Sequence, residues 1–180
     1  MPITINGTGT VTGISAGGLP DGVITTDDIA AGAVTTPKIT GGPSFSAYAN
    51  ATQTVSNAVN TKVILNTERW DTANAFDSTT NYRFQPTVAG YYQFNGVLRT
   101  FYSTLSVVYV ELWKNGAAYI RGSENNTTTA QVTVSEIIFL NGSTDYVEMY
   151  GFISGTGTLQ FQYFDATFTS RLSGALIRPA

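Results

Sequence analysis

Lysine and glutamate side chains are the groups through which this 180-residue chain could carry out catalysis, because it contains no His and no Cys. The lack of His removes the most frequent general base and zinc ligand. A serine nucleophile would then need a lysine as its base. The lysines are Lys38, Lys62 and Lys114, and no motif marks any of them as catalytic.

Paired carboxylates are the other catalytic arrangement that the composition allows, and they would suit glycan hydrolysis. The available glutamates include Glu111, Glu124, Glu136 and Glu148. All of these except Glu124 fall within expected strands, where a single acid usually faces solvent or pairs with arginine. We therefore predict that the protein is not an enzyme, with a glycan-degrading activity as the remote alternative.

Glu68, Asp71 and Asp77 could contribute to a loop Ca²⁺ site together with carbonyl oxygens. Their spacing matches no calcium-loop motif, and acids in turns usually cap the backbone or are solvated. The Gly-Thr-Gly segments at 7–9 and 155–157 are not followed by an expected helix, so neither predicts phosphate binding. We expect no cofactor and leave a structural Ca²⁺ open.

Charged residues make up 12% of the chain, which has a net charge of −3, whereas an average domain is about 25% charged. The basic residues are scattered along the sequence without a cluster, which argues against nucleic-acid binding. No apolar run is long enough to span a bilayer, and residues 1–7 lack the basic and apolar regions of a signal peptide. We expect neither membrane insertion nor secretion.

The chain changes character near Gly41-Gly42-Pro43, because every aromatic residue lies at Phe45 or later. Aromatic side chains bury the largest areas, so residues 1–40 cannot build a core alone. We predict an extended N-terminal segment at 1–40 and a folded head at 41–180. The N-terminal segment has aliphatic residues at intervals of five, namely Ile14, Leu19, Ile24, Ile29, Val34 and Ile39.

That interval fits neither the helical nor the strand period. Residues 22–29 and 32–39 also form a ten-residue internal repeat. Three parallel copies could point these aliphatic residues toward a shared axis, so we predict a trimeric fibrous stalk with the six residues along its axis. A flexible linker whose aliphatic residues recur by chance is the alternative.

The head has many short apolar segments separated by turn residues such as Asn115-Gly116 and Asn141-Gly142, and no sustained helical period. This pattern predicts an all-β antiparallel sandwich or jelly roll. The segments around Tyr91-Tyr92 and at 145–153 are apolar on both faces, which favours self-association, although tyrosine on an ordinary surface is the alternative. The expected strands are 45–48, 62–65, 82–84, 90–101, 106–114, 117–121, 130–140, 146–153, 158–164 and 168–177.

Residues 76–94 resemble the signature of the complement-1q/tumour-necrosis-factor-like jelly rolls. They begin with Phe-Asp, continue through an aromatic residue before a proline, and end in Gly-Tyr-Tyr-Gln-Phe. Residues 44–48 are similar to the first strand of that family and residues 170–177 to its last, so the resemblance covers about 44–178. We interpret the signature residues as core formers, and they are Phe76, Pro86, Gly90, Tyr92, Phe94 and Gly174.

The resemblance implies a compact homotrimer with both termini near one end, carried on a fibrous stalk. The Thr/Ile/Gly-rich segment at 1–40 takes the place of collagen triplets and resembles bacteriophage virion and tail-fibre proteins. We therefore predict a trimeric fibre or appendage on the surface of the phage particle. Residues 1–40 would attach it to other virion proteins.

The head would then mediate attachment to a host surface glycan or protein, with three identical loop surfaces adding avidity. The candidate contact loops contain Asn125, Asn126, Gly155 and Thr156. The alternative is a capsid decoration or head-fibre protein that stabilises the shell without recognising a host.

Overall fold

Alternation of apolar and polar side chains produces the longest strands of the head. In the computed structural model, which describes residues 41–100, 104–126 and 131–180, β7 (Gly90–Arg99) and β10 (Gln131–Leu140) bury every second side chain. Successive side chains of a strand point to opposite faces. Tyr92, Phe94 and Leu98 therefore enter the core, while Tyr91, Gln93 and Asn95 face outward.

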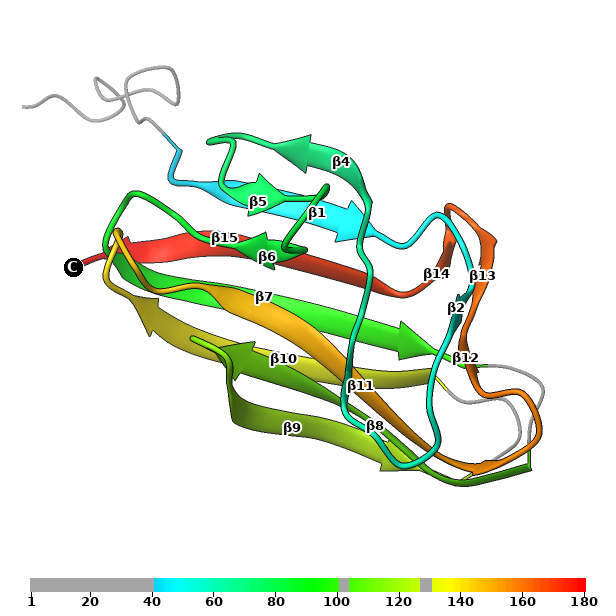
Figure 1. Cartoon of the computed structure of the whole chain (residues 1–180). Helices are drawn as coiled ribbons and strands as arrows, with labels where there is room; N and C mark the ends of the chain where they lie inside the picture. Colours follow the sequence, from blue (N-terminus) through cyan, green and yellow to red (C-terminus); the bar gives the residue numbers. More distant parts are fainter. Residues whose placement is uncertain (1–40, 101–103, 127–130) are drawn as a thin grey trace, which may run out of the picture. The chain divides into compact units, whose positions relative to one another are not determined.

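Two antiparallel sheets pack face to face (Figure 1). The first sheet has the order β10-β7-β15-β1-β4, and it adds β15 (Arg171–Pro179), β1 (Ser44–Tyr48) and β4 (Thr67–Asp71). The second has the order β5-β6-β11-β8-β9, made of β5 (Phe76–Asp77), β6 (Arg83–Phe84), β11 (Val147–Thr156), β8 (Thr104–Lys114) and β9 (Ala117–Asn125). The predicted all-β antiparallel jelly roll is confirmed.

Short strands complete the sandwich. They are β2 (Gln53–Thr54), β3 (Thr61–Lys62), β12 (Gln160–Phe161), β13 (Tyr163–Asp165) and β14 (Phe168–Thr169). β3 pairs with β11, β12 with β2, and β13 with β14. The described part of the chain contains no helix of the length and apolar character needed to cross a membrane.

Aromatic rings from both sheets form the centre of the core. Phe45 stacks on Phe76 and Phe84, with ring centroids 4.8 and 4.5 Å apart, and the edge of Phe84 meets Tyr92 at 5.5 Å. A Cβ atom at Gly174 would lie 2.8 Å from the Phe45 ring, so the packing requires glycine there.

The strand boundaries differ from the prediction in several places, including the unexpected two-residue strands β2 and β5. The exposed strand β4 was not expected, because its polar sequence lacks an apolar face. The expected strands at 158–164 and 168–177 are interrupted by a hairpin, β13–β14, because the Asp165 carboxylate accepts hydrogen bonds from the N–H groups of Thr167 and Phe168 at 2.7 and 2.9 Å. This local turn chemistry divides an otherwise apolar run.

The two sheets approach each other along the side formed by β9 and β10. The Ser123 hydroxyl donates to the Thr133 carbonyl at 3.2 Å and accepts from the Thr133 N–H at 2.7 Å. A Cβ atom at Gly122 would lie 2.1 Å from the same carbonyl oxygen, so only glycine permits this approach. A side chain thus joins the edges of two different sheets.

Both ends of the described domain lie at one end of the sandwich, as the resemblance implied (Figure 1). The Leu176 N–H donates to the Pro43 carbonyl at 2.9 Å, and the Ala180 N–H donates to the Ala89 carbonyl at 3.1 Å. We call this the terminal end. The opposite end, which carries the β13–β14 hairpin and the start of β8, is called the distal end.

Candidate functional site

The outer face of the first sheet carries a broad band without charged side chains. The outward residues of this band, which we call the neutral face, are Trp70, Tyr91, Gln93, Asn95, Val97, Ser135, Ile137, Phe139, Ser173 and Ala175. Trp70, Tyr91, Ile137 and Phe139 are exposed. An exposed patch of large apolar side chains commonly marks a protein interaction surface.

A shallow groove of about 330 Å³ lies within the neutral face. Trp70 lines it together with Gln93 and Asn95, and the small residues 173–175 are also among its lining residues. The Ser135 hydroxyl connects the side chains of Gln93 and Asn95. It accepts a hydrogen bond from the Gln93 side-chain amide at 2.9 Å and donates one to the Asn95 side-chain oxygen at 3.0 Å. Amide and hydroxyl groups thus border the groove beside the ring of Trp70.

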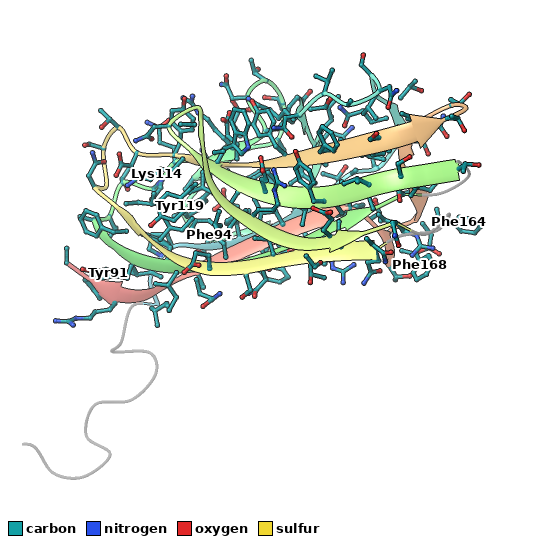
Figure 2. The ribbon with its side chains drawn as sticks, turned by 90° about the horizontal axis from the view of Figure 1, so that it is seen from below. Tyr91, Phe94, Lys114, Tyr119, Phe164 and Phe168 are labelled. Carbon is teal, nitrogen blue, oxygen red and sulfur yellow. The ribbon has the colours of Figure 1, made fainter. Side chains whose placement is uncertain are left out.

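Tyr91 and Phe139 continue the neutral face toward the terminal end. Their ring centroids lie 5.4 Å apart across β7 and β10. Figure 2 shows Tyr91 at one end of the sandwich and Phe164 and Phe168 at the other, with Phe94 between the sheets. Exposed aromatic residues therefore lie at both ends of the domain.

The outer face of the second sheet is charged, and its charges are paired within the chain. Lys62 forms an ion pair with Glu148, and Arg121 with Glu111 at 3.1 Å. Between these pairs, the Trp113 and Tyr150 rings stack at 3.9 Å. The Tyr109 and Phe152 rings stack at 4.5 Å. The outward apolar residues of the segment 145–153 have partners on β8, so they do not by themselves require another subunit.

Replacing Lys62 with Met should destabilise the head, because it leaves the buried carboxylate of Glu148 without its cation. The expected loss is about 1–3 kcal/mol in the free energy of unfolding, measured by urea denaturation. Adding Glu148→Gln to this variant should recover part of the loss. A double variant that is less stable than Lys62→Met would contradict this account.

The glutamates considered for glycan hydrolysis are held in structural interactions. Glu111 and Glu148 are buried, and each is held in an ion pair, Glu111 with Arg121 and Glu148 with Lys62. Glu124 lies 3.8 Å from Arg121, and the carboxylate of Glu136 accepts the Ile137 N–H at 2.9 Å. The arrangement offers no acid and base facing each other across a cleft among the described glutamates.

The lysines considered as bases are similarly engaged. Lys62 pairs with Glu148, and Lys114 pairs with Asp145 at 2.9 Å. The Asn115 side chain, which donates to Asp145 at 2.8 Å, is the main cause of a lowered pKa of Asp145. Lys38 lies outside the described residues.

The acids considered for Ca²⁺ lie near a polar pocket of about 530 Å³, lined in part by Glu68 and Asp77. Asp77 accepts hydrogen bonds from the N–H groups of Thr79, Thr80 and Asn81 at 2.9–3.1 Å. Asp71 accepts from the N–H of Phe76 at 2.7 Å. These donors take the lone pairs that a cation would need, and the described residues contain no group of three or more metal-ligating His, Cys, Asp or Glu side chains.

Asp77 should make the stability of the head sensitive to acid. The Thr80 and Thr79 N–H groups, with the Asn81 side chain, hold the pKa of Asp77 well below its ordinary value. Its stabilising contribution is therefore complete above the unfolded pKa of about 3.9 and is lost as pH falls toward the folded pKa. Urea midpoints of Asp77→Asn should fall less between pH 5 and pH 3 than those of the unchanged protein. Parallel curves would contradict this assignment.

The signature residues predicted as core formers lie in the interior. Phe76, Tyr92 and Phe94 are buried in the aromatic centre, and Pro86 and Gly90 are buried before and at the start of β7. Gly174 lies against the rings of Phe45 and Phe94. They thus hold the two sheets together and do not form a surface site.

The structure brings the candidate contact loops to one end of β8, on its two sides. Asn125 pairs with Val108 on one side, whereas Gly155 pairs with Leu105 and Thr156 with Thr104 on the other. Asn125 and Asn126 line a recess of about 400 Å³, of which Gly155 and Thr156 are not part. The predicted axial residues of the stalk, Ile14, Leu19, Ile24, Ile29, Val34 and Ile39, lie outside the described residues.

Three basic residues that are scattered along the sequence lie near one another in the fold. Arg69, Arg99 and Arg171 come from β4, β7 and β15 and reach neighbouring positions at the distal end of the first sheet. They are far apart in the sequence, and Arg69 lies on the strand that was not predicted. Only the register of the strands could have revealed them.

No protein-family model and no curated protein sequence matches this chain. Among solved structures, it is similar to the globular domain of zebrafish complement 1qA protein, with a TM-score of 0.56 and 17% sequence identity over 77% of this chain and 99% of that one. It is also similar to murine APRIL, with a TM-score of 0.57 and 8% identity over 76% of this chain and 99% of that one. At such identities the likeness concerns the fold, and the head has the complement-1q/tumour-necrosis-factor-like jelly-roll fold.

Proposed function

We propose that this protein is a homotrimeric fibre or appendage of a bacteriophage particle, and that its jelly-roll head attaches to the host surface. The neutral face carries this proposal. It exposes Tyr91, Ile137, Phe139 and Trp70 on a sheet face with small and amide side chains between them. The ten residues of this face are uncharged, so packing them together buries no unpaired charge, with Arg178 opposite Tyr91 and Arg171 opposite Val97 at its borders.

The positions of the termini and of the loops at opposite ends of the head support the same proposal. Residue 43 and the C-terminal strand meet at the terminal end, which is where the proposed stalk would join the head. The aliphatic residues at five-residue intervals would then continue the threefold association into a stalk. The polar loops around Asn125 and Thr156 lie at the distal end, away from the stalk attachment, where a host receptor would be reached.

Light scattering with mass determination tests the association. The full chain and residues 43–180 should both have the mass of three chains, whereas a monomer in both would overturn the proposal. Binding of the purified protein to bacterial cells and to empty phage capsids tests the role. Binding to host cells supports attachment, and binding to capsids alone would instead identify a decoration protein.

A further inference from the structure

Three arginines form a row across the distal end of the first sheet. Arg171 is paired with Tyr48 on β1 and with Val97 on β7. Arg99 lies two residues beyond Val97, so it is on the same face of the sheet. The guanidinium of Arg69 lies 5.0 Å from the centroid of the Tyr48 ring. We call Arg69, Arg99 and Arg171 the arginine row.

No ion pair of the described residues includes a member of the arginine row, because these pairs use Lys62, Lys114 and Arg121. The one acid that acts on Arg99 is Asp165, which interacts with it through charge and uses one carboxylate oxygen, Oδ1, in the turn between β13 and β14. A chain with a net charge of −3 thus gathers three positive charges at one place.

The β13–β14 hairpin holds two of these arginines in position. The Arg99 guanidinium carbon lies 3.4 Å from the centroid of the Phe168 ring, and Arg69 donates to the Ala166 carbonyl. The Nε atom of Arg99 is buried and has no hydrogen-bond partner among the described residues. This buried Nε cannot reach an external anion, so any anion would contact the terminal nitrogens of the positioned guanidiniums, which bind carboxylate and phosphate through paired hydrogen bonds.

Aromatic side chains flank the row. Phe168 is exposed, and Phe164 is the most exposed large apolar side chain of the described residues. Figure 2 shows both at the distal end. Exposed aromatic rings next to cations suit a ligand that combines an apolar ring face with a negative charge, as an acidic sugar does.

We propose that the arginine row binds the carboxylate or phosphate groups of an anionic polysaccharide on the host surface, with Phe164 and Phe168 packing against its sugar rings. This inference rests on the proposed attachment function and assigns its ligand class. It places the ligand beside the β13–β14 hairpin rather than in the loops around Asn125 and Gly155. Three heads in one trimer would bind successive charged units of one polymer.

The test uses the full chain and three immobilised polymers: polygalacturonate for carboxylate, poly(glycerol phosphate) for phosphate, and uncharged dextran. We expect binding to at least one anionic polymer, weakening with added salt, and no binding to dextran. Arg99→Gln and Arg171→Gln should each weaken binding roughly tenfold. The matched control Arg178→Gln, on the same strand as Arg171 but at the terminal end, should bind as the unchanged protein does.

Light scattering of each variant checks that it still assembles. Arg69→Gln provides a further variant that should have little effect on folding, because the Arg69 side chain is exposed. Failure of the unchanged protein to bind either anionic polymer, or equal binding by the arginine variants, would overturn the inference. The proposed function has its own tests. An Arg99→Gln/Arg171→Gln protein that remains trimeric and still binds host cells would refute the anion site while leaving attachment intact.

Discussion

Ile137→Glu is expected to reduce the mass of the protein in solution from three chains to one. Ile137 lies in the middle of β10 on the neutral face, opposite Gln93 on β7, and is 49% exposed in the single chain. The substitution therefore does not disturb the core. In the proposed trimer it would place three carboxylates among the uncharged residues of the neutral face, whose bordering cations, Arg171 and Arg178, lie opposite Val97 and Tyr91 rather than opposite Gln93.

The size of this effect follows from the cost of burying an unpaired charge, on the order of 2–5 kcal/mol for each copy. Three such costs exceed what an interface with few charged contacts can offset, so dissociation should be complete at micromolar concentration. Light scattering gives the mass directly, and circular dichroism confirms that the sheets remain folded.

Tyr119→Glu is the matched control. Tyr119 lies on β9 and is 51% exposed, so the two substitutions introduce the same charge at sites of equal exposure in strands of different sheets. This variant should keep the mass of three chains. If Ile137→Glu remained trimeric, or if both variants dissociated equally, the neutral face would not be the contact surface.

Phe84→Ala should cause the largest loss of stability, about 3–5 kcal/mol in the free energy of unfolding. Phe84 is fully buried and stacks on Phe45, and its other neighbours in the aromatic centre are Tyr92 and Phe94. Removing its ring leaves a cavity between the sheets that these neighbours cannot fill. Urea unfolding should be followed at one chain concentration, because the stability of an oligomer depends on concentration.

A Phe-to-Ala substitution at an exposed position provides the control for Phe84→Ala. Phe164 is 66% exposed on the β13–β14 hairpin, and Phe164→Ala should alter the free energy of unfolding by less than about 0.5 kcal/mol. Similar losses in both variants would contradict the aromatic centre as the main source of stability.

The fold could be predicted because its strongest determinants are close together in the sequence. Phe76, Pro86, Gly90 and Phe94 lie within one short segment, and their types and spacing reflect packing between the two sheets. Strand β4 could not be predicted in the same way, because its residues face solvent or the edge of the sheet and show no apolar alternation.

The candidate surfaces were only partly predictable for a related reason. The exposed position of Tyr91 follows from alternation along one strand, so its role in association could be expected. Trp70 and Ile137 join it through strand register, which the sequence does not reveal. The arginine row depends on the register of four strands and on the path of a hairpin, so its residues appeared scattered.

The bond between Ser123 and Thr133 has a consequence for solubility at high concentration. A long unpaired strand at the edge of a sheet is a template for amyloid-like aggregation, and many proteins protect such edges with charges. This domain has few charges, and its two longest edge strands are β9 and β10. At this point the Ser123 hydroxyl of β9 occupies the backbone N–H and carbonyl of Thr133 on β10. The opposite edges are a bulged strand, β4, and the two-residue β5. The fold thus limits edge-to-edge polymerisation through its geometry.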